Sequence, residues 1–272
     1  MKKSISLLVA TMAASNTMTA LAADEFSATV ALKAWDTTAS KYLPNLIGSS
    51  PNQSPIIIVG ESSHTTAWIP SVSIRYKDFM VGGSHFAKQA YNFGGSEDIN
   101  RQEFDLVAGY YVLPTLAIIA GYKEIKQDFE ISARAQEWKY SGPIIGFSAS
   151  APLTGGFSLY GSAAIGTLKF RPKGSFADVR QFNSLLAGGF VANSDADYKL
   201  GEVGIAYAFD PGKTAGLNAL IATLGYRSQT LLVKQNGRVA ASSNPSVFIY
   251  SWEGLKGRDS TEGVTLSIIG AF

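Results

Sequence analysis

The sequence has no cysteine and few charged residues, and both shortages narrow the kinds of protein that it encodes. Without cysteine there is no disulfide, no thiolate metal ligand and no cysteine nucleophile. Charged residues make up 16% of the chain, well below the roughly 25% of ordinary soluble domains. Hydrophobic residues reach 46%, yet no apolar run approaches the ~18 residues of a membrane helix. This combination suits a β-barrel whose outer face contacts lipid.

The first residues form a targeting segment. Lys2 and Lys3 precede a short apolar stretch, and Ala20-Leu21-Ala22 gives the small-x-small pattern of a signal-peptidase site. We therefore predict a cleavable signal peptide over residues 1–22, with cleavage after Ala22 or Ala23, and a single barrel domain over residues 23–272. The competing interpretation, an N-terminal helix of a cytosolic protein, does not explain the full three-part pattern.

Cleavage removes the whole charge excess. Two of the 23 basic residues and none of the 21 acidic residues lie in the signal peptide, which leaves 21 of each sign. A neutral mature chain gives no electrostatic reason to expect nucleic acid as a partner.

Strand-forming residues recur in stretches of about ten, separated by turn residues. The pattern predicts ten strands, at Phe26–Trp35, Ala67–Tyr76, Phe79–His85, Gln102–Leu113, Leu116–Gln127, Trp138–Ala151, Phe157–Phe170, Asp197–Phe209, Thr214–Leu231 and Thr261–Phe272. Eight or twelve strands are the alternatives, and an extra hairpin formed by Tyr42–Ile47 and Pro55–Gly60 would make twelve. Val247–Trp252 is expected to extend the last outer loop as a protruding β-ribbon.

The connections between these strands alternate regularly in length. Four are short, at 77–78, 114–115, 152–156 and 210–213, and they separate five long ones, at 36–66, 86–101, 128–137, 171–196 and 232–260. Tight turns at one end and long loops at the other are typical of bacterial outer-membrane barrels. The fold class is therefore predicted to be an all-β, antiparallel, up-and-down transmembrane barrel in the outer membrane.

Alternation along the strands separates a lipid-facing side from a side directed into the barrel. Six charged residues fall on the inward side: Arg75, Glu103, Asp105, Lys123, Glu202 and Arg227. They serve either as a selectivity lining for a small pore or as internal ion pairs that fill a narrow barrel. Aromatic residues gather at strand ends, as interfacial girdles require: Trp35, Trp68, Tyr76, Tyr110, Tyr111, Trp138, Tyr140, Phe209, Tyr226 and Trp252.

The last ten residues, from Gly263 to Phe272, resemble the C-terminal strand of outer-membrane proteins. Leu266, Ile268 and the terminal Phe272 match the alternating apolar pattern of that strand, while Gly270 stands where an aromatic residue is common. The resemblance implies recognition by the barrel-assembly machinery as one partner, with outer-membrane lipid and lipopolysaccharide as others. The hairpin Gly109–Tyr122 also resembles those of small bacterial barrels.

Catalytic chemistry finds little support. The only histidines are His64 and His85, and neither adjacent serine, Ser63 or Ser84, makes a dyad with its neighbour along a strand. Ten-strand protease barrels of the omptin type use acidic pairs and a histidine near the outer rim. Asp195 and Asp197 lie near an expected outer rim, but no Asp-x-His element accompanies them. No metal-ligand spacing or phosphate-binding glycine motif is present, so we expect neither an enzyme nor a cofactor.

Two functions remain from the sequence. The first is a small passive, porin-like channel for ions or small solutes. The second is a closed structural or surface-interaction barrel whose outer loops contact a host surface or another ligand. A barrel hydrolase ranks third.

Overall fold

The computed structural model of the protein describes residues 26–45, 56–93, 98–131, 134–174, 191–209, 216–241 and 244–272. The predicted signal peptide, residues 1–22, lies outside the described residues. The chain forms eleven strands: β1 (Phe26–Asn45), β2 (Ile56–Glu61), β3 (Thr65–Tyr76), β4 (Phe79–Asn92), β5 (Asp98–Leu113), β6 (Leu116–Ile131), β7 (Arg134–Pro152), β8 (Phe157–Gly174), β9 (Val191–Phe209), β10 (Ala219–Ala241) and β11 (Asn244–Ala271).

The sheet closes on itself because β11 pairs with β1 as well as with β10. All neighbouring strands are antiparallel, and β2 and β3 both pair with β1, on successive parts of its length. Between them, Ser62 to His64 oppose only two β1 residues, which makes a one-residue bulge. The Ser62 hydroxyl closes this bulge by accepting the Ala39 N–H at 2.8 Å. The barrel therefore has ten strands, as the sequence predicts, and β2 with β3 counts as one of them.

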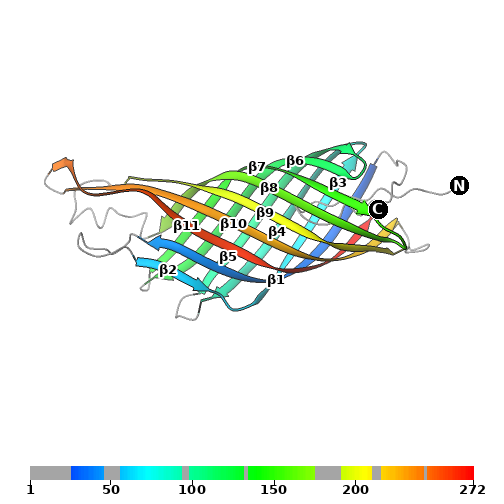
Figure 1. The fold of residues 1–272 in the computed structure, drawn as a ribbon, viewed down its shortest axis with the longest axis horizontal. Coiled ribbons are helices and arrows are strands. Elements are labelled where there is room, and N and C mark those ends of the chain that lie inside the picture. The colour runs from blue at the N-terminus through cyan, green and yellow to red at the C-terminus, as the bar shows by residue number, and fades with distance from the viewer. Residues whose placement is uncertain are drawn as a thin grey trace.

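The strands run further at the outer end than the alternation indicates (Figure 1). β1 continues to Asn45 rather than Trp35, and β11 begins at Asn244 rather than Thr261. The expected extra hairpin is this extension, because Lys41–Asn45 pairs with Ile56–Gly60 along existing strands. In Figure 1 the orange β10–β11 hairpin projects beyond the other strands, at the end opposite the C-terminus, as the predicted ribbon.

The short turns at Lys77-Asp78 and Pro114-Thr115 are confirmed. The turn between β7 and β8 contains Gly155 and Gly156, both with positive φ, a conformation that glycine adopts without steric cost. The predicted turn 210–213 lies outside the described residues, and β10 starts at Ala219 rather than Thr214.

A continuous apolar band covers the outside of the barrel. Every fully spanning strand contributes large exposed hydrophobic side chains to it, among them Val30, Val72, Val81, Leu106, Ile118, Ile145, Ile165, Ile205, Leu224 and Leu266. Beyond the band, on the same outward face, ion pairs replace apolar contacts: Lys126 lies 3.0 Å from Glu137, and Lys139 lies 2.7 Å from Glu124. The hydrogen bond to Glu137 raises the pKa of the half-buried Lys126 ammonium. The switch from apolar to charged marks where lipid gives way to water.

The aromatic residues divide between two faces, which corrects part of the girdle prediction. Trp68, Tyr76, Tyr110, Phe209 and Tyr226 are exposed toward lipid, but Trp35, Tyr111, Trp138 and Tyr140 are buried inside the barrel. The side chain of Trp252 lies outside the described ones. Period-two alternation, rather than nearness to a strand end, decides which side an aromatic ring occupies.

At one boundary between neighbouring strands, the β3–β4 seam, the ladder of backbone hydrogen bonds is incomplete. β3 pairs with β4 only from Ser71 to Tyr76, and no ladder pair joins residues 65–70 to β4, although residues 56–93 are all described. Pro70 has no N–H to donate, and a bulge in β4 between Phe86 and Gln89 displaces that strand. The seam is held instead by the Gln89 side chain, which donates to the Thr65 hydroxyl at 2.6 Å, and by the Ser63 N–H, which donates to the Asn92 carbonyl at 2.9 Å.

We predict that this seam opens locally before any other part of the wall that the structure describes. Amides of β3 between Thr66 and Ile69 that face β4 should exchange hydrogen at least about tenfold faster than those of Ile118–Ile125. The β6 segment is the matched control, because it is paired on both sides. Hydrogen exchange followed by mass spectrometry measures the difference, and equal protection of the two segments would contradict it.

Candidate functional site

The six charged residues predicted to face inward occupy two environments. Glu103, Asp105, Lys123, Glu202 and Arg227 are buried in the barrel interior. Arg75 is half-buried at the periplasmic end, where its guanidinium carbon lies 4.2 Å from the centre of the Tyr111 ring and its Nε donates to the Lys77 carbonyl.

Glu202, on β9, is the centre of the first group of contacts. Lys33 donates to both of its carboxylate oxygens, at 2.8 and 2.9 Å. The hydroxyls of Tyr160 and Thr265 donate to the same carboxylate at 3.2 and 3.3 Å. The nearest guanidinium nitrogen of Arg227 is 3.7 Å away, which is an ion pair without a hydrogen bond. Five strands thus converge on one buried carboxylate.

The second group surrounds Glu103 on β5. Lys123 lies 2.6 Å from one oxygen of Glu103 and 2.8 Å from Asp105, and Arg101 lies 2.7 Å from the other oxygen of Glu103. The Ser84 hydroxyl donates to Asp105 at 3.2 Å. Because each charge has an opposite charge in contact with it, the desolvation of these groups is largely offset.

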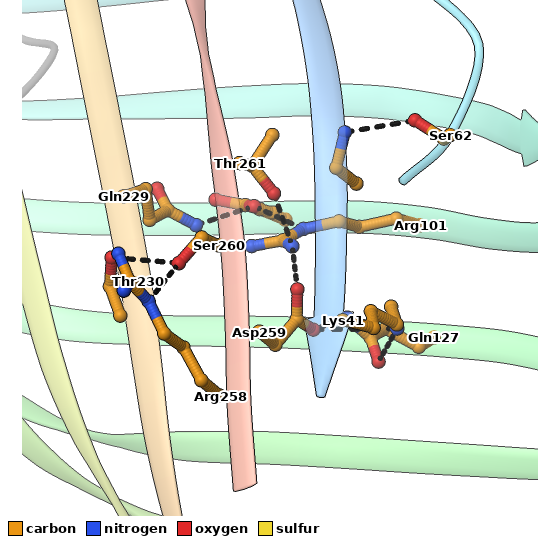
Figure 2. A network of polar contacts seen from close by, with 12 residues as sticks. Lys41, Ser62, Arg101, Gln127, Gln229, Thr230, Arg258, Asp259, Ser260 and Thr261 are labelled. Carbon is orange, nitrogen blue, oxygen red and sulfur yellow. Dashed lines mark hydrogen bonds and ion pairs between the residues drawn. The ribbon is translucent and has the colours of Figure 1, made fainter. Parts of the chain in front are cut away.

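The third group lies nearer the outer end and is shown in Figure 2. Asp259 on β11 accepts a hydrogen bond from Gln127 at 2.6 Å and pairs with Lys41 and Arg101, each at 3.4 Å. Lys41 also donates to the Gln127 side-chain oxygen at 2.9 Å. Arg101 joins this group to the second one, since it contacts both Glu103 and Asp259.

Two of these hydrogen bonds cross the whole lumen. Gln229 on β10 donates to Glu103 on β5 at 2.8 Å, and Gln127 on β6 donates to Asp259 on β11. In the cycle of ten strands, each bond joins strands that are five apart, which places them on opposite walls. Side chains therefore bridge the barrel from wall to wall at two levels.

Apolar side chains fill much of the remaining interior. The largest buried cluster lines β4 to β10 and includes Val107, Ile125, Leu168, Leu200 and Val233. A second, with Trp35, Ile69 and Phe86, lies behind the β3–β4 seam. The interior thus resembles the packed core of a small soluble protein more than a hydrated pore.

Four buried charges of this interior were not identified from the sequence: Lys33, Lys41, Arg101 and Asp259. Lys33 alternates with the exposed Val30 and Leu32, so the same period-two test applied to the first strand would have found it. The other three lie in stretches interpreted as loops.

The residues considered for catalysis are not brought together. His64 and Asp36 are exposed on the outer wall, with Nδ1 of the histidine 3.9 Å from a carboxylate oxygen. His85 and Asp195 are also exposed, on different parts of the wall. Within the described residues, no group of three or more acidic or histidine side chains is placed to hold a metal ion.

No known protein family and no curated protein matches the chain. Among solved structures, it is similar to the outer membrane protease OmpT from Escherichia coli, with 14% identity, 92% of this chain and 97% of that chain covered, and a TM-score of 0.51. It also matches the outer membrane protein OprG from Pseudomonas aeruginosa, at 11% identity over 90% of this chain and 93% of that one, with a TM-score of 0.36. The Pseudomonas putida toluene transporter TodX matches at 8% identity over 92% and 90%, with a TM-score of 0.32.

At this identity the likeness to OmpT establishes the fold and carries no activity across. The chain is an outer-membrane β-barrel, and its place is the bacterial outer membrane. In the described part of the chain, no helix is both long enough and apolar enough to cross a bilayer.

Proposed function

We propose that this barrel is closed and acts through the parts of its wall and ribbon that stand above the membrane, not as a passive channel. The observation that carries the proposal is the pair of hydrogen bonds that cross the lumen, Gln229 to Glu103 and Gln127 to Asp259. A channel for ions or small solutes requires water-accessible walls along the lumen. Here the inward charges Lys33, Lys123 and Asp259 are at most 1% exposed.

The charge pattern also favours a closed barrel. In a selectivity filter, charged side chains contact the permeating ions directly. Those side chains therefore face an aqueous path. In this barrel Glu103 and Asp105 share the ammonium of Lys123, and Arg101 is shared by two carboxylates. Such mutual pairing stiffens the wall and leaves little charge to attract a solute.

The strand lengths indicate where function resides. A membrane-spanning strand needs about 9–11 residues, but β10 has 23 and β11 has 28. The excess rises as a ribbon beyond the rest of the wall (Figure 1). We propose that this outer structure contacts lipopolysaccharide or a ligand on another surface, without a catalytic reaction or a cofactor.

Planar-bilayer recording of the purified, refolded protein tests the closed state. We expect no unitary currents from preparations whose heat-dependent electrophoretic mobility shows that the barrel is folded. Discrete, ion-dependent single-channel steps from the same preparation would overturn the proposal and favour the channel.

A ribbon-deleted variant separates the barrel from its outer extension. Replacing residues 234–256 by a short glycine-containing turn removes only strand that extends past the membrane. We expect the heat-dependent mobility and the electrical silence to persist, because the lumen contacts lie below the deletion. Loss of the folded, heat-modifiable form would show that the ribbon is instead part of the barrel's stable core.

A further inference from the structure

The buried charges of the interior do not balance. Among the described residues, the acidic side chains buried in the barrel are Glu103, Asp105, Glu202 and Asp259. The basic ones are Lys33, Lys41, Arg101, Lys123 and Arg227. One positive charge is therefore in excess, in surroundings where an uncompensated charge is unfavourable.

The contacts assign this excess to Arg227. Lys33 holds both oxygens of Glu202, and the carboxylates of Glu103, Asp105 and Asp259 are in contact with Lys123, Arg101 and Lys41. Arg227 has its nearest carboxylate oxygen at 3.7 Å and otherwise donates to the neutral amide of Gln229 at 3.3 Å. Its Nε is buried and has no hydrogen-bond partner.

A second unsatisfied donor lies beside it. The guanidinium carbon of Arg227 is 4.8 Å from the centre of the Trp35 ring. The indole Nε1 of Trp35 is also buried without a hydrogen-bond partner, and the residue as a whole is 0% exposed. Both groups are obligatory donors that cannot accept a hydrogen bond. Two unpaired N–H groups next to an excess positive charge favour an acceptor that carries negative charge, because such an acceptor satisfies the donors and offsets the charge.

We propose that Arg227 and Trp35 form a buried binding site for a small inorganic anion, with chloride as the physiological occupant. The closed interior sets the size limit, because Trp35, Arg227 and Glu202 are all nearly inaccessible to solvent. A monatomic halide is smaller than a phosphate or a carboxylate-bearing solute, and it is therefore the occupant that a closed interior favours. The ion enters during folding or local opening, supplies the missing charge and accepts both N–H groups.

The experiment compares chloride with gluconate, a larger anion, at equal ionic strength. Protein refolded in each salt is unfolded thermally in detergent micelles. We expect the unfolding midpoint to rise with chloride and to saturate, and bromide to substitute for chloride. The same midpoint in both salts at all concentrations would overturn the proposal, because it would show that no anion is needed to satisfy the two donors.

Three substitutions locate the effect. Arg227→Gln should abolish the chloride dependence. Trp35→Phe keeps the ring that Arg227 stacks on but removes the indole donor, so we expect the apparent chloride affinity to fall about tenfold or more. Trp68→Phe, at the lipid-facing tryptophan, is the matched control and should respond as the unsubstituted protein does.

If Arg227→Gln does not fold, iodide quenching provides an independent readout. Iodide bound at the site should quench the fluorescence of Trp35 with a saturating dependence that chloride competes away. That saturating component should be absent from Trp35→Phe and present in Trp68→Phe. Chloride dependence that survives unchanged in Trp35→Phe, or quenching that chloride does not compete, would contradict the assignment.

Discussion

Glu202→Gln is expected to destabilise the barrel by about 3–5 kcal/mol, because it removes one member of a buried ion pair and leaves the other charges uncompensated. Lys33 would lose the carboxylate that accepts two hydrogen bonds from it, and Arg227 would lose its nearest negative charge. The amide that replaces the carboxylate still accepts one hydrogen bond but carries no charge. Equilibrium unfolding in urea, followed by tryptophan fluorescence in lipid vesicles, measures the loss.

Two companion variants show whether the loss comes from the broken pair. Glu262→Gln removes an exposed carboxylate from β11 and should change the stability by less than about 0.5 kcal/mol. The double variant Lys33→Met, Glu202→Leu replaces the pair by apolar side chains and should recover a large part of the loss, since buried pairs are often exchangeable for well-packed hydrophobic residues. A single variant as stable as the unsubstituted protein would disprove the pairing as a source of stability.

Gly204→Val is expected to have the second large effect, a loss of about 3 kcal/mol or a failure to form the folded barrel. A Cβ at this position would collide with the carbonyl oxygen of Leu224 and would lie 2.7 Å from both the Cα of Gly225 and the Cε1 of Tyr160. The backbone atoms belong to the neighbouring strand and cannot yield without breaking the ladder. The Tyr160 ring would also move and carry its hydroxyl away from Glu202.

Gly201→Val supplies the matched control on the same strand. Gly201 faces outward, and a Cβ there meets nothing within 4 Å. We expect this variant to fold and to keep the heat-dependent electrophoretic mobility, while Gly204→Val loses it. Equal behaviour of the two variants would show that the close approach at Gly204 is not required.

The hydrogen bonds that cross the lumen are the reason that we propose a closed barrel rather than the channel that the sequence first suggested. Mixed charges on an inward face are compatible with either a filter or a plug, and the sequence offers no way to choose between them. The decision depends on whether Glu103 and Asp259 meet water or the opposite wall. In the structure each accepts a hydrogen bond from a glutamine five strands away around the barrel.

The sequence alone predicted ten barrel strands, the turns at 77–78 and 114–115, and the inward direction of the six charged residues on the membrane-spanning stretches. Period-two alternation is a local property, and lipid imposes it wherever a strand crosses the apolar layer. The alternation of apolar and polar residues ends above the membrane, because the outward residues there, such as Lys126 and Lys139, are as polar as loop residues. For that reason Lys41, Arg101 and Asp259 were assigned to loops although they are buried within strands.

Only the tertiary structure decided how the inward charges are paired. Lys33 and Glu202 are 169 residues apart in the sequence, and Gln229 and Glu103 are 126 apart. Alternation indicates that each of these side chains points inward, but partners across a lumen are set by the closure of the barrel and the stagger of its strands. The same closure places Arg227 against Trp35 with two donors unpaired, because neighbouring walls and not neighbouring residues supply the contacts of a barrel interior.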